Sequence, residues 1–394
     1  WFYHRFRVTI KAKINEREET EMLKLVLGTS GSGKTTLLYA RIRARAEAGK
    51  RSILLVPEQF TSSTEARIYR ELGDALSGMV ESYSFTSLAE HILAVEGGAA
   101  VQTLTDAGRA VLVRRALEEL QDNVHYYYRH RRSAAFCQMA AETIDELKSA
   151  GLSGQQLQEL ARDCGTESAK LGELALIFQG YESLLAGTGM DPADRLELAA
   201  DRLEAALARD ELPDFLRERE VFIDEFDTFN APKKRLMGAM LAALPAVTVA
   251  LCEDGAPMQP GDLELFSGAK QVAAQLRQLA RKNGAQVAAP ELLRRDLRHK
   301  DAPGLAALTE LLETGSCTPP ESAPELRLFA AASREEEARC AAAAIRRLMR
   351  QGVRCGKIAV VCRDISLYRA AVRYEFRMAE IPLYCDEPTT PEFS

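Results

Sequence analysis

The sequence predicts an α/β protein in which helices alternate with the strands of a parallel sheet. Three observations carry this prediction. An apolar segment, a glycine-rich turn and a helix-forming segment follow one another over residues 23–48. A second apolar segment, residues 221–223, ends in two consecutive acidic residues. Between the two, residues 106–209 are rich in Ala, Leu and Glu and predict a helical insertion into the sheet domain.

The expected elements follow from apolar runs bounded by Gly, Pro and polar residues. The strands of the first sheet are expected at residues 23–27, 52–56, 79–83, 221–223 and 247–251. The first helix is expected at residues 36–48, with Gly49 as its C-terminal stop. After a softer stretch with scattered Pro and Gly, a strand, a helix and a strand return at residues 326–330, 334–350 and 357–362.

Composition narrows the class of protein. The 394 residues are 46% hydrophobic and 27% charged, which excludes a disordered or fibrous chain and suggests two or three domains. The net charge of −6 excludes a protein that coats nucleic acid through bulk positive charge, although a local basic groove stays possible. No apolar run approaches the roughly 20 residues of a membrane span, so no membrane partner is expected. The eight cysteines include no C-x-x-C pair and no H-E-x-x-H occurs, which favours reduced thiols in a cytoplasmic protein.

The domain boundaries are expected where the pattern changes. Residues 1–21 are expected to be a non-native leader, because the sequence begins with Trp1 and Met22 directly precedes the first strand. The chain also stops without a closing element, which suggests a fragment of a longer protein. The expected parts are a P-loop ATPase-like domain (22–105 and 210–285), a helical insertion (106–209), a linker (286–324) and the truncated beginning of a second domain (325–394).

The turn at residues 28–35, GTSGSGKT, matches the phosphate-binding pattern G-x-x-x-x-G-K-[ST] between a strand and a helix. Glycines let backbone N–H groups turn inward around phosphates, Lys34 supplies a charge for the β and γ phosphates, and Thr35 supplies a hydroxyl ligand for Mg²⁺. A chance Gly/Ser-rich turn is the competing interpretation, and the flanking strand and helix disfavour it. The predicted nucleotide-binding residues are Gly28, Gly31, Ser32, Gly33, Lys34, Thr35 and Thr36.

An ATPase of this kind also needs acidic residues at the end of a neighbouring strand, and residues 221–225, VFIDE, supply them. Asp224 is expected to hold Mg²⁺, and Glu225 to orient or deprotonate the attacking water. An ordinary acidic turn after a strand is the alternative. Because Lys34 and Asp224 lie far apart in the sequence, the helical insertion must separate two halves of one ATPase core.

These residues resemble the N-terminal part of the AddB family, the AddB component of the bacterial ATP-dependent helicase/deoxyribonuclease, and more distantly UvrD/Rep superfamily 1 helicases. The resemblance begins at Met22 and runs to the end of the chain. Its most specific parts are PEQF at residues 57–60 and the blocks SREEEA and AVVCRD near the end. The segments that carry it are residues 23–36, 54–60, 84–89, 221–229, 333–338, 358–364 and 381–382.

The resemblance implies a RecA-like fold with the start of a second RecA-like domain, and ATP and Mg²⁺ as cofactors. It further implies an AddA-type helicase-nuclease subunit as heterodimer partner, acting on broken duplex ends and single-stranded DNA, and recognition of a regulatory sequence in the emerging strand. The family's nuclease and its four-cysteine iron–sulfur cluster are expected only in the C-terminal region, beyond Ser394. In related helicases the loop after the second strand touches single-stranded DNA, so Gln59, Phe60, Thr61 and Ser62 are expected DNA-binding residues. Phe85 and Thr86 follow the next predicted strand at the same edge of the sheet and are expected to contact DNA as well.

Two of these features have simpler interpretations. Ser62-x-x-Glu65 is also a capping box, which would make the hydroxyl-rich loop a helix start. The segment at residues 125–132, HYYYRHRR, interleaves aromatic and basic residues in a way that suits nucleic acid. An amphipathic surface segment whose tyrosines pack on neighbouring helices is the preferred interpretation of that segment.

The chain also departs from a complete motor. No glutamine motif that reads adenine precedes Gly28, no coupling Gln occurs at residues 251–254, and no Asn-Tyr-Arg-Ser-like arginine motif is recognised at residues 292–298. The family's acidic pair is often Asp-Gly, whereas this chain has Asp224-Glu225. Besides an AddB-type subunit, a free-standing superfamily 1 helicase and a pseudo-motor scaffold that binds ATP statically and grips single-stranded DNA stay open as alternatives.

Overall fold

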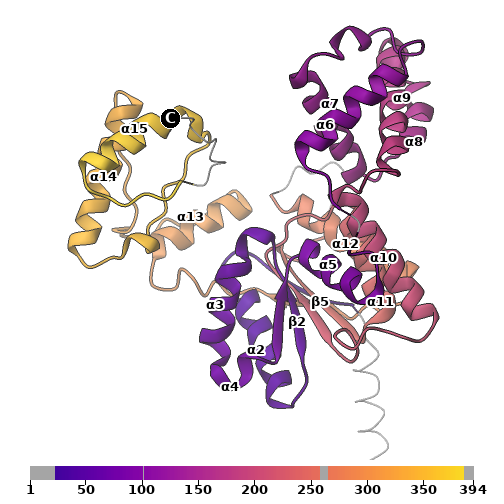
Figure 1. The fold of residues 1–394 in the computed structure, drawn as a ribbon. Helices are drawn as coiled ribbons and strands as arrows, with labels where there is room; N and C mark the ends of the chain where they lie inside the picture. Colours follow the sequence, from indigo (N-terminus) through magenta and orange to yellow (C-terminus); the bar gives the residue numbers. More distant parts are fainter. Residues whose placement is uncertain (1–22, 101, 258–264, 386–394) are drawn as a thin grey trace, which may run out of the picture. The chain divides into compact units, whose positions relative to one another are not determined.

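The computed structural model describes residues 23–100, 102–257 and 265–385 (Figure 1). The proposed leader and the last residues, 386–394, lie outside the described residues. The chain divides into two compact units, one ending at Asp301 and the other beginning at Ala302. No helix among the described residues is long and apolar enough to cross a membrane.

The first unit is built on a six-stranded parallel sheet in the order β3-β2-β4-β5-β1-β6. Its strands are β1 (Leu23–Gly28), β2 (Ser52–Leu55), β3 (Val80–Tyr83), β4 (Glu220–Ile223), β5 (Ala246–Cys252) and β6 (Glu291–Leu293). The α/β class and the five expected strands of this sheet are confirmed. The strand order places β4 beside β2 and β5, so that residues following β1 and β4 meet at one edge of the sheet.

Strand β6 departs from the prediction, because it lies within the stretch expected to be a linker. It pairs with β1 from Val26↔Glu291 to Gly28↔Leu293. Three residues followed by several arginines show no strand periodicity, and their pairing with β1 is what makes them a strand. The chain through Asp301 therefore belongs to the sheet unit, and residues 303–314 of the expected linker form the helix α13 (Pro303–Thr314).

Helices cover both faces of the sheet (Figure 1). Alternate residues of β1 face opposite sides: Leu25 packs in the cluster that includes α5 and α10–α12, and Val26 packs in the cluster that includes α2 and α3. The helices of the sheet unit are α2 (Lys34–Glu47), α3 (Thr61–Leu72), α4 (Asp74–Ser77), α5 (Phe85–Glu96), α10 (Pro192–Ala208), α11 (Ala231–Ala243) and α12 (Ser267–Lys282), with the 3₁₀ turn η1 (Glu58–Phe60).

The insertion after α5 is helical, as the composition predicts. It consists of α6 (Asp106–Glu119), η2 (Tyr128–His130), α7 (Ala134–Ser149), α8 (Gly154–Ala161), η3 (Gly165–Glu167) and α9 (Ser168–Leu185). These helices have a core of their own, with Val113, Phe178 and Tyr181 buried at its centre. Helix α10, which the expected insertion included, instead packs Leu196 and Leu203 into the core of the sheet domain.

The second unit contains α13, α14 (Arg334–Arg350), η4 (Cys355–Lys357) and α15 (Ile365–Met378). Helix α14 matches its prediction and is capped by Ser333, whose hydroxyl accepts from the Glu336 N–H. The expected strands at residues 326–330 and 357–362 do not form in the described part of this unit. A strand exists only through ladder hydrogen bonds, and neither segment has a neighbour that supplies them there.

Candidate nucleotide-binding site

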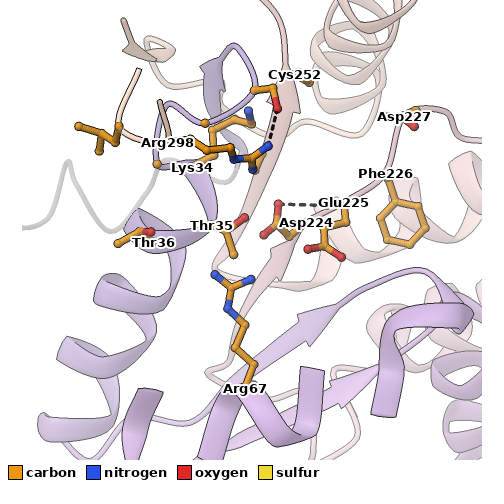
Figure 2. A pocket seen from close by; sticks show the side chains of 15 residues that line it. Lys34, Thr35, Thr36, Arg67, Asp224, Glu225, Phe226, Asp227, Cys252 and Arg298 are labelled. Carbon is orange, nitrogen blue, oxygen red and sulfur yellow. Dashed lines mark hydrogen bonds between the residues drawn. The ribbon is translucent and has the colours of Figure 1, made fainter. Parts of the chain in front are cut away.

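A cleft of about 530 Å³ opens at the carboxyl ends of β1, β4 and β5 (Figure 2). Ligands of open α/β sheets bind at this edge because strand ends and helix N-termini converge there. The turn after β1 forms one side of the cleft and the residues after β4 form the opposite side. Of the predicted nucleotide-binding residues, Gly31, Gly33, Lys34, Thr35 and Thr36 line it, together with the acidic pair.

The turn needs glycine at defined positions. Gly31 has φ of 83° and Gly33 has φ of 93°, both in the left-handed region that glycine adopts without strain. A Cβ on Gly31 would lie 2.8 Å from the Cβ of Arg298, so a side chain there would also displace the segment that crosses the turn. A Cβ on Gly28 would meet the Ser32 hydroxyl, which is why β1 must end in glycine.

Two polar groups of the turn are arranged for a ligand. The Lys34 ammonium donates to the carbonyl oxygens of Gly28 at 2.8 Å and Thr29 at 2.9 Å, which holds it at the mouth of the turn. The Ser32 residue is 4% exposed, and its hydroxyl has no hydrogen-bond partner among the described residues. A buried hydroxyl without a partner costs free energy, about 1–3 kcal/mol, so this group favours a bound acceptor such as a phosphate.

The acidic pair follows β4 directly. Asp224 is 5% exposed, and its N–H extends the sheet by donating to the Leu55 carbonyl at 3.1 Å. Burial raises the pKa of Asp224, while a hydrogen bond from Thr35 and the cationic groups of Lys34 and Arg67 oppose the shift. The residues after β1 and β4 thus line the same cleft, and the Thr35 hydroxyl and the Asp224 carboxylate face one another in Figure 2.

Glu225 lies beside Asp224 and is partly shielded from solvent. Its φ of 65° is unusual for a residue with a side chain, and its N–H donates to the Asp224 Oδ1 at 3.0 Å. The strained turn directs the Glu225 carboxylate toward the cleft next to Asp224 (Figure 2). Partial burial and the neighbouring Asp224 carboxylate raise the pKa of Glu225, and Arg67 opposes them. A raised pKa suits a group that accepts a proton during catalysis.

The oxygen atoms of Thr35 and Asp224 fit a magnesium ion that arrives with a nucleotide. No group of three or more His, Cys, Asp or Glu residues that could hold a metal occurs among the described residues. Mg²⁺ does not require such a group, because it is usually held by one or two carboxylates, substrate phosphates and water. A hydroxyl beside a carboxylate at the phosphate turn is the donor set that this arrangement needs.

Two arginines in the cleft were not predicted. Arg67 of α3 stacks its guanidinium 4.9 Å from the Tyr39 ring centroid and points toward Thr35 and Asp224 (Figure 2). Arg298 donates from Nη1 to the Ser30 hydroxyl at 3.0 Å, and the preceding Leu297 N–H donates to the Gly31 carbonyl at 3.0 Å. No arginine motif was recognised at residues 292–298. The available signal was the run of arginines immediately after β6, whose carboxyl end lies beside that of β1.

The loop after β2 is open to solvent at the predicted DNA-binding residues Gln59, Phe60 and Ser62, while Thr61 is half-buried. The capping box predicted from Ser62 and Glu65 does not form, because α3 begins at Thr61 without a side-chain cap. The hydroxyls of Thr61 and Ser63 instead donate to the carbonyls of Glu58 and Phe60. The Thr61 N–H also donates to the Glu58 carbonyl, because α3 continues directly from η1, so this helix start offers its side chains to a ligand more than its first N–H group.

The second predicted DNA segment needs a correction at Phe85. This residue is 2% exposed, and its ring packs edge-on against Phe226 and Phe229 at 5.3 and 5.9 Å between centroids. It is a core residue, so its ring offers no stacking face to a base. The neighbouring Thr86 is exposed, but the Ser84 hydroxyl already accepts from the Ser87 N–H in a capping box at the start of α5.

A parallel sheet with a phosphate-binding turn after β1 and an aspartate at the end of an adjacent strand defines the P-loop class of nucleotide-binding proteins, here in its RecA-like form. Comparison with known proteins narrows the class. The family described as "ADDB, N-terminal" matches residues 25–309, so the chain belongs to the AddB family.

Relatives support the same family. The chain is 33% identical over 379 residues to the AddB component of the ATP-dependent helicase/deoxyribonuclease of Moorella thermoacetica, covering 92% of this chain and 32% of that protein. It is 34% identical over 381 residues to the protein of the same name from Desulforudis audaxviator, with the same two coverages. The chain thus spans about a third of the length of the curated relatives it matches.

Proposed function

We propose that this chain is the ATP-binding, helicase-like part of an AddB-type subunit, in a helicase-nuclease complex that processes DNA double-strand breaks for recombinational repair. The observation that carries the proposal is that Lys34, Thr35 and Asp224 line one cleft at the phosphate turn, in a chain that belongs to the AddB family. The unit from Ala302 onward is proposed to be the beginning of a second helicase-like domain.

The residues of the cleft would divide the binding of Mg·ATP among them. The backbone N–H groups of the turn and the N-terminus of α2 would surround the phosphates, and Lys34 would exchange its carbonyl acceptors for phosphate oxygens. Thr35 and Asp224 would hold Mg²⁺, which neutralises the phosphate charge. Arg298 is close enough to Ser30 to reach a phosphate bound in the turn.

Hydrolysis is the second part of this proposal. Glu225 would orient the attacking water and accept its proton, a role that its raised pKa and its position beside Asp224 suit. Arg67 would keep Glu225 sufficiently ionised to act as a base, because its positive charge lowers the pKa of that carboxyl. Static binding without turnover is the alternative that the experiment below distinguishes.

The test separates binding from turnover in two variants. Lys34→Ala should weaken the binding of a fluorescent ATP analogue, because it removes the charge at the β and γ phosphates. Glu225→Gln should leave that affinity nearly unchanged and reduce ATP turnover by about 10²-fold or more. Lys50→Ala, which removes an exposed lysine beyond the far end of α2, serves as a matched control. Unchanged analogue affinity in Lys34→Ala would reject the pocket, and unchanged turnover in Glu225→Gln would reject the catalytic role of that carboxylate. If the unchanged chain binds the ATP analogue but does not hydrolyse ATP, static ATP binding is the supported function.

The substrate and partner are proposed from the family. We propose that the complex, with an AddA-type partner, acts in the cytoplasm on broken duplex ends and single-stranded DNA. In this chain the loop after β2 would contact the single strand through Gln59, Phe60, Thr61 and Ser62, with Thr86 as a further contact. Phe60, 36% exposed, would stack on a base, an interaction worth about 1–3 kcal/mol. Phe60→Ala should weaken oligonucleotide binding without altering ATP-analogue affinity.

A further inference from the structure

The segment between α6 and α7, two helices of the insertion labelled in Figure 1, is rich in positively charged residues. Residues 125–132, the basic loop, contain three arginines, two histidines and no acidic residue, in a chain whose net charge is −6. His125, Arg129, His130 and Arg132 are exposed, and Arg131 is half-buried. A local reversal of the overall charge on an exposed loop is typical of a surface that meets an anionic partner.

The backbone of the basic loop is held by one carboxylate. The N–H groups of His125, Tyr126 and Tyr127 all donate to Glu173 of α9, at distances between 2.8 and 3.1 Å. The preceding Val124 is fully buried in the core of the insertion. Three consecutive N–H groups on one carboxylate fix the direction of the chain, so the loop is an ordered part of the surface.

The tyrosines of the loop position the cations. Arg131 lies 3.9 Å from the Tyr128 ring centroid, and Arg129 lies 5.6 Å from that of Tyr126. A guanidinium stacked on an aromatic ring uses its face and leaves its N–H edge for a planar or tetrahedral anion. Tyr127 stacks on Phe136 at 5.5 Å, so its ring is engaged within the protein. Arg131 Nη1 also donates to the Tyr128 carbonyl and Arg129 Nε to His130 Nε2, both at 3.2 Å, so the loop orients both guanidiniums and offers their remaining N–H groups.

These guanidiniums are not neutralised by carboxylates. Within the part of the chain that the structure describes, Arg129, Arg131 and Arg132 form no ion pair. On the neighbouring helix α6, by contrast, Arg114 and Arg115 pair with Glu118 and Glu119 at 3.1 and 3.0 Å. The same domain thus contains paired arginines and a group of arginines held in position without an acidic partner.

We propose that the basic loop binds the phosphodiester backbone of DNA and forms a second DNA-contacting surface besides the loop after β2. Ordered guanidiniums without a carboxylate partner suit phosphate oxygens, which accept two N–H groups at once. Because Tyr127 stacks on Phe136 and Arg131 lies over Tyr128, the loop would hold the backbone chiefly through its charges. An acidic protein segment is the other class of anion, but three guanidiniums within four residues match closely spaced phosphates better.

The test compares two double variants that remove the same charge from the same domain. R129Q/R132Q should weaken binding of a fluorescein-labelled oligothymidylate severalfold, and the slope of log affinity against log salt should fall by about 0.7 for each lost phosphate contact. R114Q/R115Q should leave that slope unchanged, because its arginines are already paired. A labelled duplex of equal length distinguishes single-stranded from double-stranded DNA as the source of the backbone.

Three outcomes would overturn the proposal. The first is an equal slope of log affinity against log salt for R129Q/R132Q and the unchanged chain. The second is an equal loss of DNA affinity in both double variants. The third is that polyglutamate competes for the loop as strongly as unlabelled DNA does. Affinity for the ATP analogue should be unchanged in R129Q/R132Q, and Phe60→Ala reports on the other loop. A negative result for the basic loop can therefore be told apart from a negative result for the nucleotide-binding site or for the loop after β2.

Glu173 is a positioning residue in this proposal, and its variant has a diagnostic sign. Glu173→Gln removes a negative charge near the DNA, so electrostatics alone would raise affinity. If the loop must be ordered to bind, the variant should instead weaken DNA binding and accelerate amide hydrogen exchange at His125, Tyr126 and Tyr127. Higher affinity with unchanged slope would refute the positioning role.

Discussion

The most informative stability test is the replacement of Lys148. This residue of α7 belongs to a hydrogen-bond network that links α7 and α9 of the helical insertion to the start of α10. Its side chain is 9% exposed, and its ammonium donates to Asp191 at 2.9 Å and to Asp194 at 2.8 and 3.0 Å. The Tyr181 hydroxyl, from α9, donates to the other oxygen of Asp191 at 2.7 Å. Lys148→Met keeps an unbranched side chain of nearly the same length and removes the ammonium group with its charge and hydrogen bonds.

The expected cost follows from what the substitution leaves behind. The Asp191 side chain is 2% exposed, so without Lys148 its charge is buried with the Tyr181 hydroxyl as a remaining donor. Breaking a buried ion pair by removing one partner costs about 3–5 kcal/mol. Asp194 is 33% exposed and regains water, so the lower end of that range is expected. In the double variant Lys148→Met/Asp191→Asn, roughly 1–3 kcal/mol should be recovered.

The pH dependence has a definite sign. Burial acts to lower the pKa of Lys148, but the hydrogen bonds to Asp194 and Asp191 outweigh it and raise the pKa above the ordinary value of 10.5. A raised lysine pKa contributes stability that is fully present below the unfolded-state value and is lost as pH rises through the folded-state value. The cost of Lys148→Met should therefore be constant around neutral pH and shrink in alkaline solution.

Urea unfolding followed by far-UV circular dichroism measures these differences, provided that the slope m is the same in all variants. A loss below about 1 kcal/mol for Lys148→Met would show that the network is solvated and would refute the reasoning. So would a double variant no more stable than Lys148→Met, because the buried Asp191 charge would then not be the source of the cost.

Three further predictions concern the cleft and its surroundings. Asp224→Asn should stabilise the nucleotide-free chain by roughly 0.5–2 kcal/mol at neutral pH, because burial raises the pKa of Asp224. In thermal melts this gain in stability should vanish as the pH is lowered toward the ordinary aspartate pKa of 3.8. Gly31→Ala, at φ of 83° and against Arg298, should destabilise by about 1–2 kcal/mol and weaken ATP-analogue binding measured by fluorescence titration. Phe85→Ala should cost about 3–5 kcal/mol in urea unfolding while the folded fraction keeps its DNA affinity; unchanged stability would contradict its place in the core.

The elements that could be predicted are those whose information is local. The phosphate turn, α2 and the strands with apolar residues on both faces depend on neighbouring residues in the sequence, and Leu54 and Phe222 are buried as their runs indicate. That Thr35 and Asp224 line one cleft also follows from the fold, because a parallel sheet brings the carboxyl ends of β1 and β4 to one edge.

The elements that could not be predicted depend on tertiary partners. β6 is a strand only because β1 is the neighbour with which it pairs. This pairing places the segment after β6 beside the phosphate turn, and Arg298 reaches the cleft from there. Arg67 lines the cleft because α3 packs it over the ring of Tyr39, a tertiary contact that no local pattern indicates. Conversely, residues 326–330 have strand composition but no neighbour that pairs with them in the described part of the second unit.

The position of β1 has a consequence for biosynthesis. β1 is the first strand of the described chain, yet it pairs with β5 and β6, which are among the last parts of the sheet unit to leave the ribosome. Leu23 meets Val247 only after β2, β3 and the whole helical insertion have been translated. Until then both edges of an apolar strand lack partners, a condition that promotes aggregation. The nascent chain should therefore depend on chaperones for longer than a protein whose sheet forms from consecutive strands.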